Sequence, residues 1–306
     1  MRPSAAIVLV TTSYPNKGDG SEAAGGFVED LAIELAKRIP VRVVAPGPDS
    51  LVEQAGHGLE VYRYAAPKKP LSTLRPWVPA EMFAILRLLR TGMLATRAAV
   101  AAGPTAMLIG LWALPSGEWA RRVAAETGLP YCVWTLGSDI WALGRMPGVR
   151  AMLARVLAGA RICFSDGYQL AEDTRRLAGR EVEFLPSTRS IRNRRPEPIR
   201  TAPPYRLLFL GRWHPNKGVD LLLECLGALS EEDWSRIERV EIQGGGGLEG
   251  AVTAAVDALR ASGRPVLKGG FLSKQAAEEA MLRSDLLVIP SRIESIPVVF
   301  SDAIKL

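Results

Sequence analysis

The 306-residue sequence has few of the residues that cross-link small proteins or bind structural metals: three cysteines and two histidines. Cys132, Cys163 and Cys225 are odd in number and show no ligand spacing, so we expect buried free thiols in a reducing compartment and no metal site. Long apolar runs are also missing, because stretches such as 5–10 and 285–290 are strand-length and far short of the roughly 20 residues of a spanning helix. No secretory signal is visible. These absences predict a cytoplasmic protein.

The composition is that of a globular protein, with 48% apolar and 23% charged residues, and the chain is long enough for two domains. The formal net charge is +6. Residues 61–100 contain seven arginines or lysines against Glu81 alone. This excess suits an anionic partner, which could be a membrane surface, a phosphorylated substrate or nucleic acid. No motif favours nucleic acid, and we expect none as a partner.

Short β-branched runs alternate with longer amphipathic stretches. In the first half we expect strands at 6–10, 41–46, 105–110, 131–136 and 161–165, and helices at 26–38, 81–99, 116–127 and 147–159. After a connector rich in proline and arginine the pattern restarts, with strands at 206–211, 239–244, 265–270 and 285–290 and helices at 219–229, 248–260 and 274–284. Such alternation implies parallel sheets covered on both faces. We therefore predict an α/β fold with two Rossmann-like, doubly wound domains facing a cleft, at 1–185 and 205–306, joined by a solvated linker at 186–204.

The sequence stops at SDAIKL, inside what reads as a new helix with no glycine stop signal. A second domain of four strands would then be unfinished. We expect the second domain to be incomplete, with the apolar residues of this last helix lacking later partners.

Charged residues follow the strands of the second half. Gly211 ends the first of these strands, Arg212 follows it, and Lys217 stands at the start of the next helix. Two cations at a helix N-terminus, at the carboxyl edge of a sheet, suit a diphosphate, although a basic surface turn would look the same. After the last strand, Glu294 and Asp302 lie eight positions apart, so both carboxylates can face one cleft and bind sugar or ribose hydroxyls.

Two glycine-rich stretches are less specific. Gly25 and Gly26 end a flexible stretch after the first strand, and a helix is expected directly after them, which suits an anion or sugar site or an ordinary turn. The run at 244–250 contains the Gly-x-Gly-x-x-Gly spacing of dinucleotide sites, but no acidic residue stands near the end of the strand at 265–270. An NAD site is therefore disfavoured.

The run GRWHPNKG at 211–218, the acid-x7-acid spacing from Glu294 to Asp302 and the run GGFVEDLAIELAKR at 25–38 resemble the retaining family-4 glycosyltransferases of GT-B fold, known as glycosyl transferases group 1. The resemblance extends from residue 6 to residue 306. It implies transfer of a sugar from a nucleoside diphosphate-sugar donor to a hydroxyl acceptor with retention of configuration. It further implies an acceptor-side first domain, a donor-binding second domain and no metal or other cofactor.

The resemblance also assigns residues. Arg212 and Lys217 would hold the donor diphosphate, and Glu294 would contact the donor sugar. Asp302 would hold the ribose, although the family normally has glutamate there. The remaining donor-side positions are Gly211, Gly245, Phe271, Leu272, Ser295 and Ile296, with Gly25 and Gly26 on the first domain.

The first domain departs from the family pattern. Many members carry a histidine near the reacting centre, whereas the corresponding run WTLGSDIW at 134–141 has none. Asp139 in this run would contact donor or acceptor, or would form an Asx turn or helix cap. His57 cannot be placed there from sequence, and His214 reads as a solvent-facing turn residue.

Two alternative functions stay open. One is a GT-B nucleotide-sugar epimerase, which would need further acid/base groups in the cleft, and the other is a non-catalytic nucleotide-sugar binding protein. The stretch 68–90 combines basic residues, Trp77 and an apolar helical face. It suits a helix on an anionic membrane, or an ordinary helix beside the acceptor. We expect a saccharide or lipid-linked acceptor, a role in polysaccharide or glycolipid synthesis, and a peripheral position at the inner membrane face.

Overall fold

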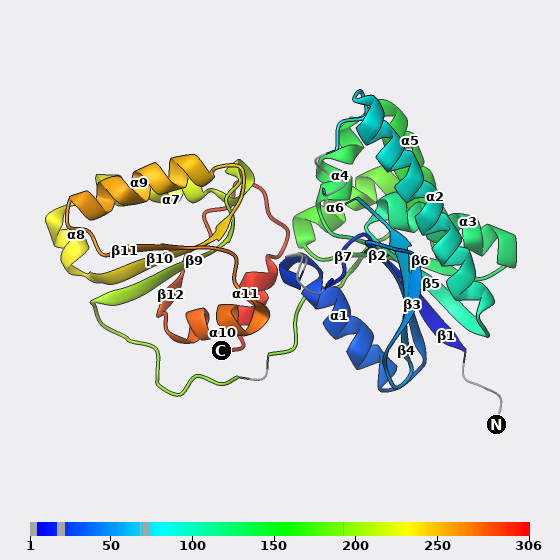
Figure 1. Cartoon of the computed structure of the whole chain (residues 1–306), viewed down its shortest axis with the longest axis horizontal. Coiled ribbons are helices and arrows are strands. Elements are labelled where there is room, and N and C mark those ends of the chain that lie inside the picture. Colours follow the sequence, from blue (N-terminus) through cyan, green and yellow to red (C-terminus); the bar gives the residue numbers. More distant parts are fainter. Residues whose placement is uncertain (1–4, 17–21, 68, 70–73, 192) are drawn as a thin grey trace. The chain divides into compact units, whose positions relative to one another are not determined.

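The chain forms two compact units, Met1–Pro186 and Ser187–Leu306, in a computed structural model that describes residues 5–16, 22–67, 69, 74–191 and 193–306 (Figure 1). Each unit contains one β-sheet with helices packed against it. The α/β prediction is therefore confirmed for each half of the chain. The two units are described separately below.

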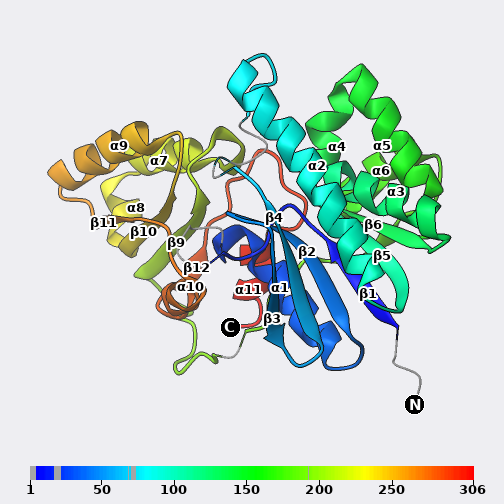
Figure 2. The same cartoon turned by 45° about the vertical axis from the view of Figure 1, so that its right-hand side comes forward.

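The first unit is built on an eight-stranded sheet of order β3-β4-β2-β1-β5-β6-β7-β8, in which only the β3–β4 pair is antiparallel. Helix α1 covers one face of this sheet, and α2 and α3 cover the other (Figures 1 and 2). The elements in chain order are β1 (Ala6–Val10), α1 (Glu22–Ala36), β2 (Val41–Gly47), β3 (Leu51–Gly56), β4 (Leu59–Ala65), α2 (Pro79–Ala101), β5 (Thr105–Leu111), the π-helical turn η2 (Ala113–Gly117), α3 (Glu118–Thr127), β6 (Tyr131–Thr135), α4 (Ser138–Trp141), the 3-10 turn η3 (Leu143–Arg145), α5 (Pro147–Gly159), β7 (Cys163–Ser165), α6 (Tyr168–Ala178) and β8 (Glu183–Phe184).

The five strands predicted for this half are present, but the hairpin of β3 and β4 was missed. Its sequence, LVEQAGHGLEVYRYA, mixes polar and apolar residues, and β3 is exposed along nearly its whole length because it forms an edge of the sheet. A search for buried β-branched runs cannot find an exposed edge strand. The short helices α4 and α6 were missed as well.

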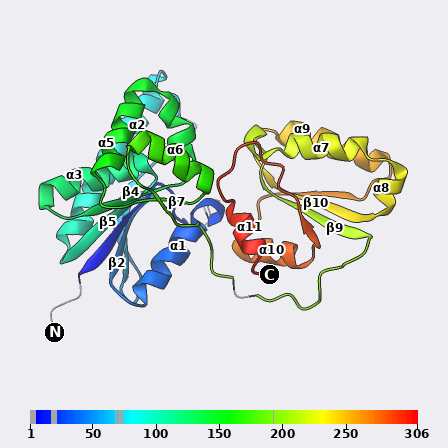
Figure 3. The same cartoon turned by 180° about the vertical axis from the view of Figure 1, so that it is seen from behind.

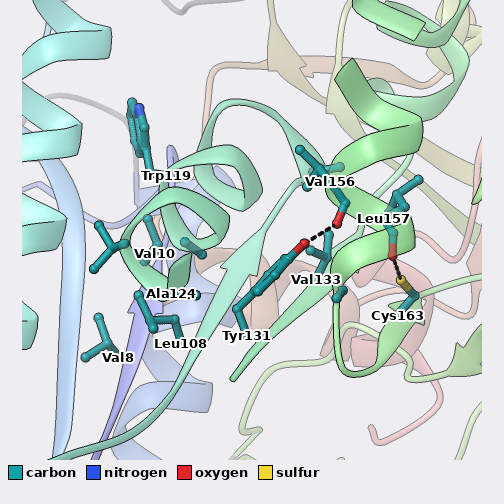
Figure 4. Close-up of a cluster of buried hydrophobic side chains, with 14 of the residues drawn as sticks. Val8, Val10, Leu108, Trp119, Ala124, Tyr131, Val133, Val156, Leu157 and Cys163 are labelled. Atoms are coloured by element: carbon teal, nitrogen blue, oxygen red, sulfur yellow. Dashed lines mark hydrogen bonds between the residues drawn. The ribbon is translucent and has the colours of Figure 1, made fainter. Parts of the chain in front are cut away.

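The core of the first unit lies between the central strands and the helices α3 and α5 (Figure 4). Val10, Leu108 and Val133 come from three neighbouring strands and are fully buried. Tyr131 donates its hydroxyl hydrogen to the carbonyl of Val156 at 2.8 Å, and Cys163 donates its thiol hydrogen to Leu157 at 3.3 Å. Burial raises the pKa of Cys163 to about 11, so this thiol is inert and buried as the sequence predicts. The prediction is wrong for Cys225, which is exposed.

The second unit contains a four-stranded, wholly parallel sheet of order β11-β10-β9-β12. Helices α7 and α9 pack on one face and α10 and α11 on the other (Figure 3). Its elements are β9 (Tyr205–Arg212), the 3-10 turn η4 (Pro215–Lys217), α7 (Val219–Ala228), α8 (Glu231–Ser235), β10 (Ile237–Gly245), α9 (Glu249–Ala261), β11 (Val266–Gly269), α10 (Lys274–Leu282), β12 (Leu286–Leu287) and α11 (Val298–Ala303).

Helix α11 packs more closely than the sequence predicts. The cluster around Leu208 and Met281 lies on the sheet face that α10 covers, and it is contacted by Val299, Ala303 and Leu306. The expectation that the apolar residues of this helix lack partners is therefore wrong for Val299. It holds better for Ile304, whose side chain is 69% exposed.

The connector after Pro186 is bound to the second unit, and its arginines are not all solvated. Arg189 is buried and forms an ion pair with Asp302, with its Nε 2.7 Å from Oδ2. Arg195 donates to the carbonyls of Leu282 and Met281 at 2.8 and 3.0 Å. The prediction of a solvated linker fails at these positions because composition cannot reveal which arginines find a carboxylate or the end of a helix.

The buried ion pair yields a stability prediction. Arg189→Met should lower the free energy of unfolding of the second unit by about 3–5 kcal/mol, because the Asp302 carboxylate would stay buried without its partner. The double variant Arg189→Met/Asp302→Leu should recover most of that loss. Urea denaturation measures both changes. Arg200→Ala is the control, since its ion pair with Glu238 is about one-third exposed on both sides and should contribute less than about 1 kcal/mol. Equal losses for Arg189→Met and Arg200→Ala would contradict the assignment.

Candidate functional site

The predicted donor-side residues gather at one edge of the second sheet. Because all four strands are parallel, their carboxyl ends meet at the same edge, and the loops after them emerge side by side. Arg212 and Gly245 are the last residues of β9 and β10, and Phe271 and Glu294 lie in the loops after β11 and β12 at this edge. Residues that are far apart in the sequence therefore lie at the same edge of the sheet.

Trp213 anchors the loop after β9 to the loop after β10. The residue is 1% exposed, its backbone N–H donates to the carbonyl of Gly245 at 2.8 Å, and its backbone carbonyl accepts from the N–H of Leu248 at 3.1 Å. His214 follows and caps η4, since its Nδ1 accepts from the N–H of Asn216 at 3.2 Å. His214 is thus an exposed turn residue, as the sequence predicts.

Gly218 permits the closest approach between the loop after β9 and the loop after β12. Its φ is +69°, and a β-carbon at this position would lie 2.0 Å from the carbonyl oxygen of Pro290. Only glycine avoids both the strained backbone and the collision. This contact places the start of α7 directly against the loop that contains Glu294.

Lys217 and Glu294, predicted separately as phosphate and sugar ligands, form an ion pair. The Lys217 ammonium contacts Oε2 of Glu294, which also accepts from the hydroxyl of Ser291 at 3.3 Å. The two side chains are 27% and 22% exposed. Each charge therefore has an internal partner and remains accessible to a ligand from solvent.

Arg212 differs from Lys217 in having no such partner. Its side chain is exposed and makes no hydrogen bond or ion pair with any residue that the structure describes. It extends from the end of β9, one residue after Gly211 and at the same edge as Lys217. An unpaired guanidinium beside a paired ammonium is an arrangement that can receive a diphosphate.

Gly244 and Gly246, at the end of β10 and just after it, allow close packing of the backbone. Gly244 and Gly246 have φ values of +149° and +142°, and β-carbons there would lie 1.9 Å from the carbonyl oxygen of Gly211 and 2.9 Å from that of Trp213. Gly247 and Gly250 face open space. The two glycines with a positive φ and a close backbone neighbour are therefore not those of the Gly-x-Gly-x-x-Gly spacing.

Phe271 lies against the end of β10. A β-carbon on Gly245 would be 2.7 Å from the Phe271 ring, so this glycine lets the ring rest on the backbone. The ring is 62% exposed and offers an apolar face at the edge of the sheet. Leu272 instead packs partly against the cluster around Leu208, which gives it a structural role.

The residues after Glu294 differ in their accessibility to a ligand. Ser295 and Ile296 are half-buried, and their backbone N–H groups donate to no acceptor within the described residues. Asp302, by contrast, is fully buried and paired with Arg189. In this structure its carboxylate is not accessible to a ribose, so the predicted grouping of Glu294 with Asp302 in one open site is not observed.

On the first unit, Gly25 and Gly26 lie within the first turn of α1, which begins at Glu22. The expected start of the helix after these glycines is therefore wrong. A β-carbon on Gly25 would lie 2.6 Å from the Cα of Tyr14, so this residue allows α1 to pack on the strand-end backbone. Part of the predicted anion-binding stretch, residues 17–21, lies outside the described residues.

Asp139 is buried and bonded to backbone. Its carboxylate accepts from the N–H groups of Ala113 at 2.8 Å, Ile140 at 3.2 Å and Leu136 at 3.3 Å. Burial raises the pKa of this carboxyl against the opposing effect of these bonds. The geometry favours the structural alternative, in which Asp139 ties the segments after β5 and β6 together.

No histidine replaces the one missing from the first domain. His57 lies in the exposed turn between β3 and β4, at the start of β4 and thus at the amino edge of the sheet, opposite the carboxyl ends. The part of the chain that the structure describes also contains no group of three His, Cys, Asp or Glu side chains suited to a metal ion.

Two residues that sequence reasoning missed stand out at these edges. Arg292 links the loop after β12 to α7 through Asp220, with two contacts of 2.8 Å. Trp112, at the end of β5, has a φ of +66°, the one positive value of a non-glycine residue among those described. The position of Arg292 two residues before Glu294 was the available signal, but its partner could not be read from the sequence.

Comparisons with known proteins concern the family of the second unit and the fold of the chain. Residues 204–306 match the family model "Glycosyl transferases group 1". No curated protein gives a significant match to the chain.

Several solved structures resemble the whole chain. Anabaena HepE in complex with UDP and glucose has a TM-score of 0.63 at 13% identity, over 98% of this chain and 78% of its own. The lipopolysaccharide outer core galactosyltransferase WaaB has 0.58 at 14%, over 96% and 76%. The catalytic domain of starch synthase IV from Arabidopsis thaliana, bound to ADP and acarbose, has 0.63 at 11%, over 99% and 81%. At these identities the likeness establishes the fold. The chain therefore has the α/β fold of the GT-B glycosyltransferases, with the glycosyl transferases group 1 match in its second half.

Proposed function

We propose that this protein transfers a sugar from a nucleoside diphosphate-sugar to a hydroxyl acceptor, with retention at the anomeric carbon as the family resemblance implies. The observation that carries the proposal is the cluster of Arg212, Lys217 and Glu294 at the carboxyl edge of the second sheet. This cluster lies within the residues that match glycosyl transferases group 1. Structural relatives whose complexes contain UDP, UDP-glucose or ADP support the class of donor.

The ion pair gives the site a way to respond to the donor. A diphosphate that approaches Arg212 would compete with Glu294 for the Lys217 ammonium, because phosphate oxygens form charge-assisted bonds of similar strength. Glu294, once released, would accept hydrogen bonds from sugar hydroxyls. Donor binding would thus exchange one internal ion pair for contacts at both the phosphate and the sugar.

The same groups would assist departure of the diphosphate. It is already a good leaving group, so the protein needs to stabilise the negative charge that develops on it rather than supply a strong acid. Arg212 and Lys217, held at the end of β9 and at the end of the turn η4, are positioned for that task. Preorganised charges of this kind usually contribute the largest share of catalysis.

The neighbouring loops suit the rest of the donor. The exposed ring of Phe271 provides a face on which a nucleobase could stack. The free N–H groups of Ser295 and Ile296 are available to phosphate or sugar oxygens. Asp302 would reach a ribose only if its pair with Arg189 opened, so we assign it no donor contact.

The α2 side of the first unit supports a further partner, an anionic membrane. Trp77, Phe83 and Leu86 are 77%, 69% and 56% exposed on one end of this helix, where Arg87 and Arg90 are also exposed. Residues 68 and 70–73 of the predicted segment lie outside the described residues. No helix in the described ranges is long and apolar enough to cross a membrane. The proposal is therefore surface attachment at the cytoplasmic face, where a lipid-linked or saccharide acceptor would be met.

Helix α5 adds to this surface. Residues 140–165 contain four arginines and no acidic residue. Met146 and Met152 are 51% and 38% exposed on α5 or next to it. The first turns of α2 and α5 reach the same end of the first unit (Figures 1 and 2). Arginines beside exposed apolar side chains on two helices match an anionic bilayer better than a neutral one.

The donor site is tested by binding. Arg212→Ala and Lys217→Ala should each weaken affinity for the matching nucleoside diphosphate by roughly 1.5–3 kcal/mol, about tenfold or more, because each removes a charge-assisted contact. Isothermal titration calorimetry with UDP, GDP and ADP measures this and identifies the base. Arg236→Ala, an exposed arginine at the amino edge of the same sheet, is the control. Unchanged affinity in both site variants would remove the phosphate assignment.

Membrane attachment is tested separately by vesicle sedimentation. Binding should require anionic lipid and should fall between about 50 and 500 mM salt, because screening shortens the reach of the arginines. Phe83→Ala and Arg87→Gln should each weaken it. Arg97→Gln serves as a control, since it lies near the opposite end of α2 and pairs with Glu126 at 2.6 Å. Equal binding to neutral and anionic vesicles would count against this partner.

A further inference from the structure

The loop that contains Glu294 and the turn that contains Lys217 are joined by one arginine side chain. The Arg292 guanidinium makes two parallel contacts of 2.8 Å with the carboxylate of Asp220, in the first turn of α7, and a third of 2.6 Å with the carbonyl of Pro215, in η4. Its backbone N–H donates to the carbonyl of Asn216 at 2.9 Å. A single residue thus contacts the turn just before Lys217 and the helix just after it.

This link adds to the contact between Gly218 and Pro290. The close approach of those two backbones fixes one point between the loops, and one point still leaves rotation free. The contacts of Arg292 with Pro215 and Asn216 lie on the other side of Lys217 in sequence, and its bidentate contact with Asp220 fixes both direction and distance because the guanidinium is planar. Together these contacts remove that freedom. Lys217 and Glu294 are then held where their charges meet.

The ion pair between Arg292 and Asp220 contributes little to the free energy of unfolding. The Arg292 and Asp220 side chains are 39% and 44% exposed, and exposed ion pairs of this kind contribute little to folding. The Arg292 guanidinium nevertheless holds the pKa of Asp220 below its ordinary value, so the pair is present throughout the neutral range. A well-formed pair with little stabilising value, placed between two site loops, points to a role in geometry.

We propose that Arg292, through Asp220, is a positioning residue that sets the distance between Lys217 and Glu294 and thereby the affinity for the nucleoside diphosphate. The reading of Lys217 as a phosphate ligand rests on the proposed function, whereas the joining of the two loops does not. Arg292 itself does not contact the ligand in this proposal. Three of the five N–H donors of its guanidinium are used on Asp220 and Pro215.

The joining of the loops is tested without any ligand by hydrogen–deuterium exchange of the full chain. Arg292→Gln and Asp220→Asn should each raise the exchange rate of peptides covering 213–218 and 290–297 by about threefold to tenfold, with little change in melting temperature. Arg264→Gln is the matched control, because Arg264 forms a comparable pair with Glu231 and touches neither loop. Unchanged exchange in both variants overturns the proposal, whatever the protein binds.

The effect on the site is tested by a mutant cycle with the nucleoside diphosphate that binds the unmodified protein. Arg292→Gln and Asp220→Asn should each weaken affinity by about fivefold, and the double variant should be no weaker than either alone. The loss from Arg292→Gln should vanish in the Lys217→Ala background, a result that mere destabilisation would not produce. If Asp220→Asn leaves affinity unchanged or raises it while Arg292→Gln lowers it, Arg292 contacts the ligand directly and the positioning role is wrong. Absence of nucleotide binding by the unmodified protein would refute the proposed function, and the exchange measurement would still decide whether Arg292 joins the loops.

Discussion

The close contact between the backbones at Gly218 and Pro290 is the constraint on which the candidate site depends. It forces the turn after β9 against the loop after β12, although 72 residues separate the two positions in the sequence. Lys217 and Glu294 can pair only because this approach is allowed, and Arg292 can reach Asp220 and Pro215 for the same reason. Any side chain at position 218 would separate the loops before affecting any charge. The site is therefore determined by a missing β-carbon as much as by its ionic groups.

Much of this edge could be predicted because parallel strands impose it. Once 206–211, 239–244, 265–270 and 285–290 are recognised as strands of one sheet, the loops after them must emerge together. Arg212 and Glu294 could therefore be placed at one edge without knowing a single contact. Their chemical types then indicated phosphate and sugar hydroxyls as ligands. Prediction was strongest where topology, rather than side-chain geometry, decides the outcome.

The partners of individual side chains could not be predicted from the sequence, and Asp302 shows why. Its spacing from Glu294 suggested two acids facing one ligand, but α11 turns its carboxylate towards the connector, where Arg189 neutralises it. Whether Asp302 binds a ligand or an internal cation depends on which residue of the connector, 113 positions earlier, packs beneath α11. Neither periodicity nor composition encodes that contact. The same limit applies to Asp139, whose carboxylate accepts from backbone N–H groups of two separate segments.

The pairing of Asp302 also changes how its departure from the family pattern is understood. A shorter acid in place of glutamate looks at first like a weakened ribose contact. In this structure the shorter side chain lies within reach of Arg189, and Ser301 and Lys305 on the same short segment bind the connector as well. A segment with three side chains bound to 187–189 attaches the connector to the rest of the second unit. Helix α11 thus secures the connector, and the proposed donor site is left to Arg212, Lys217 and Glu294.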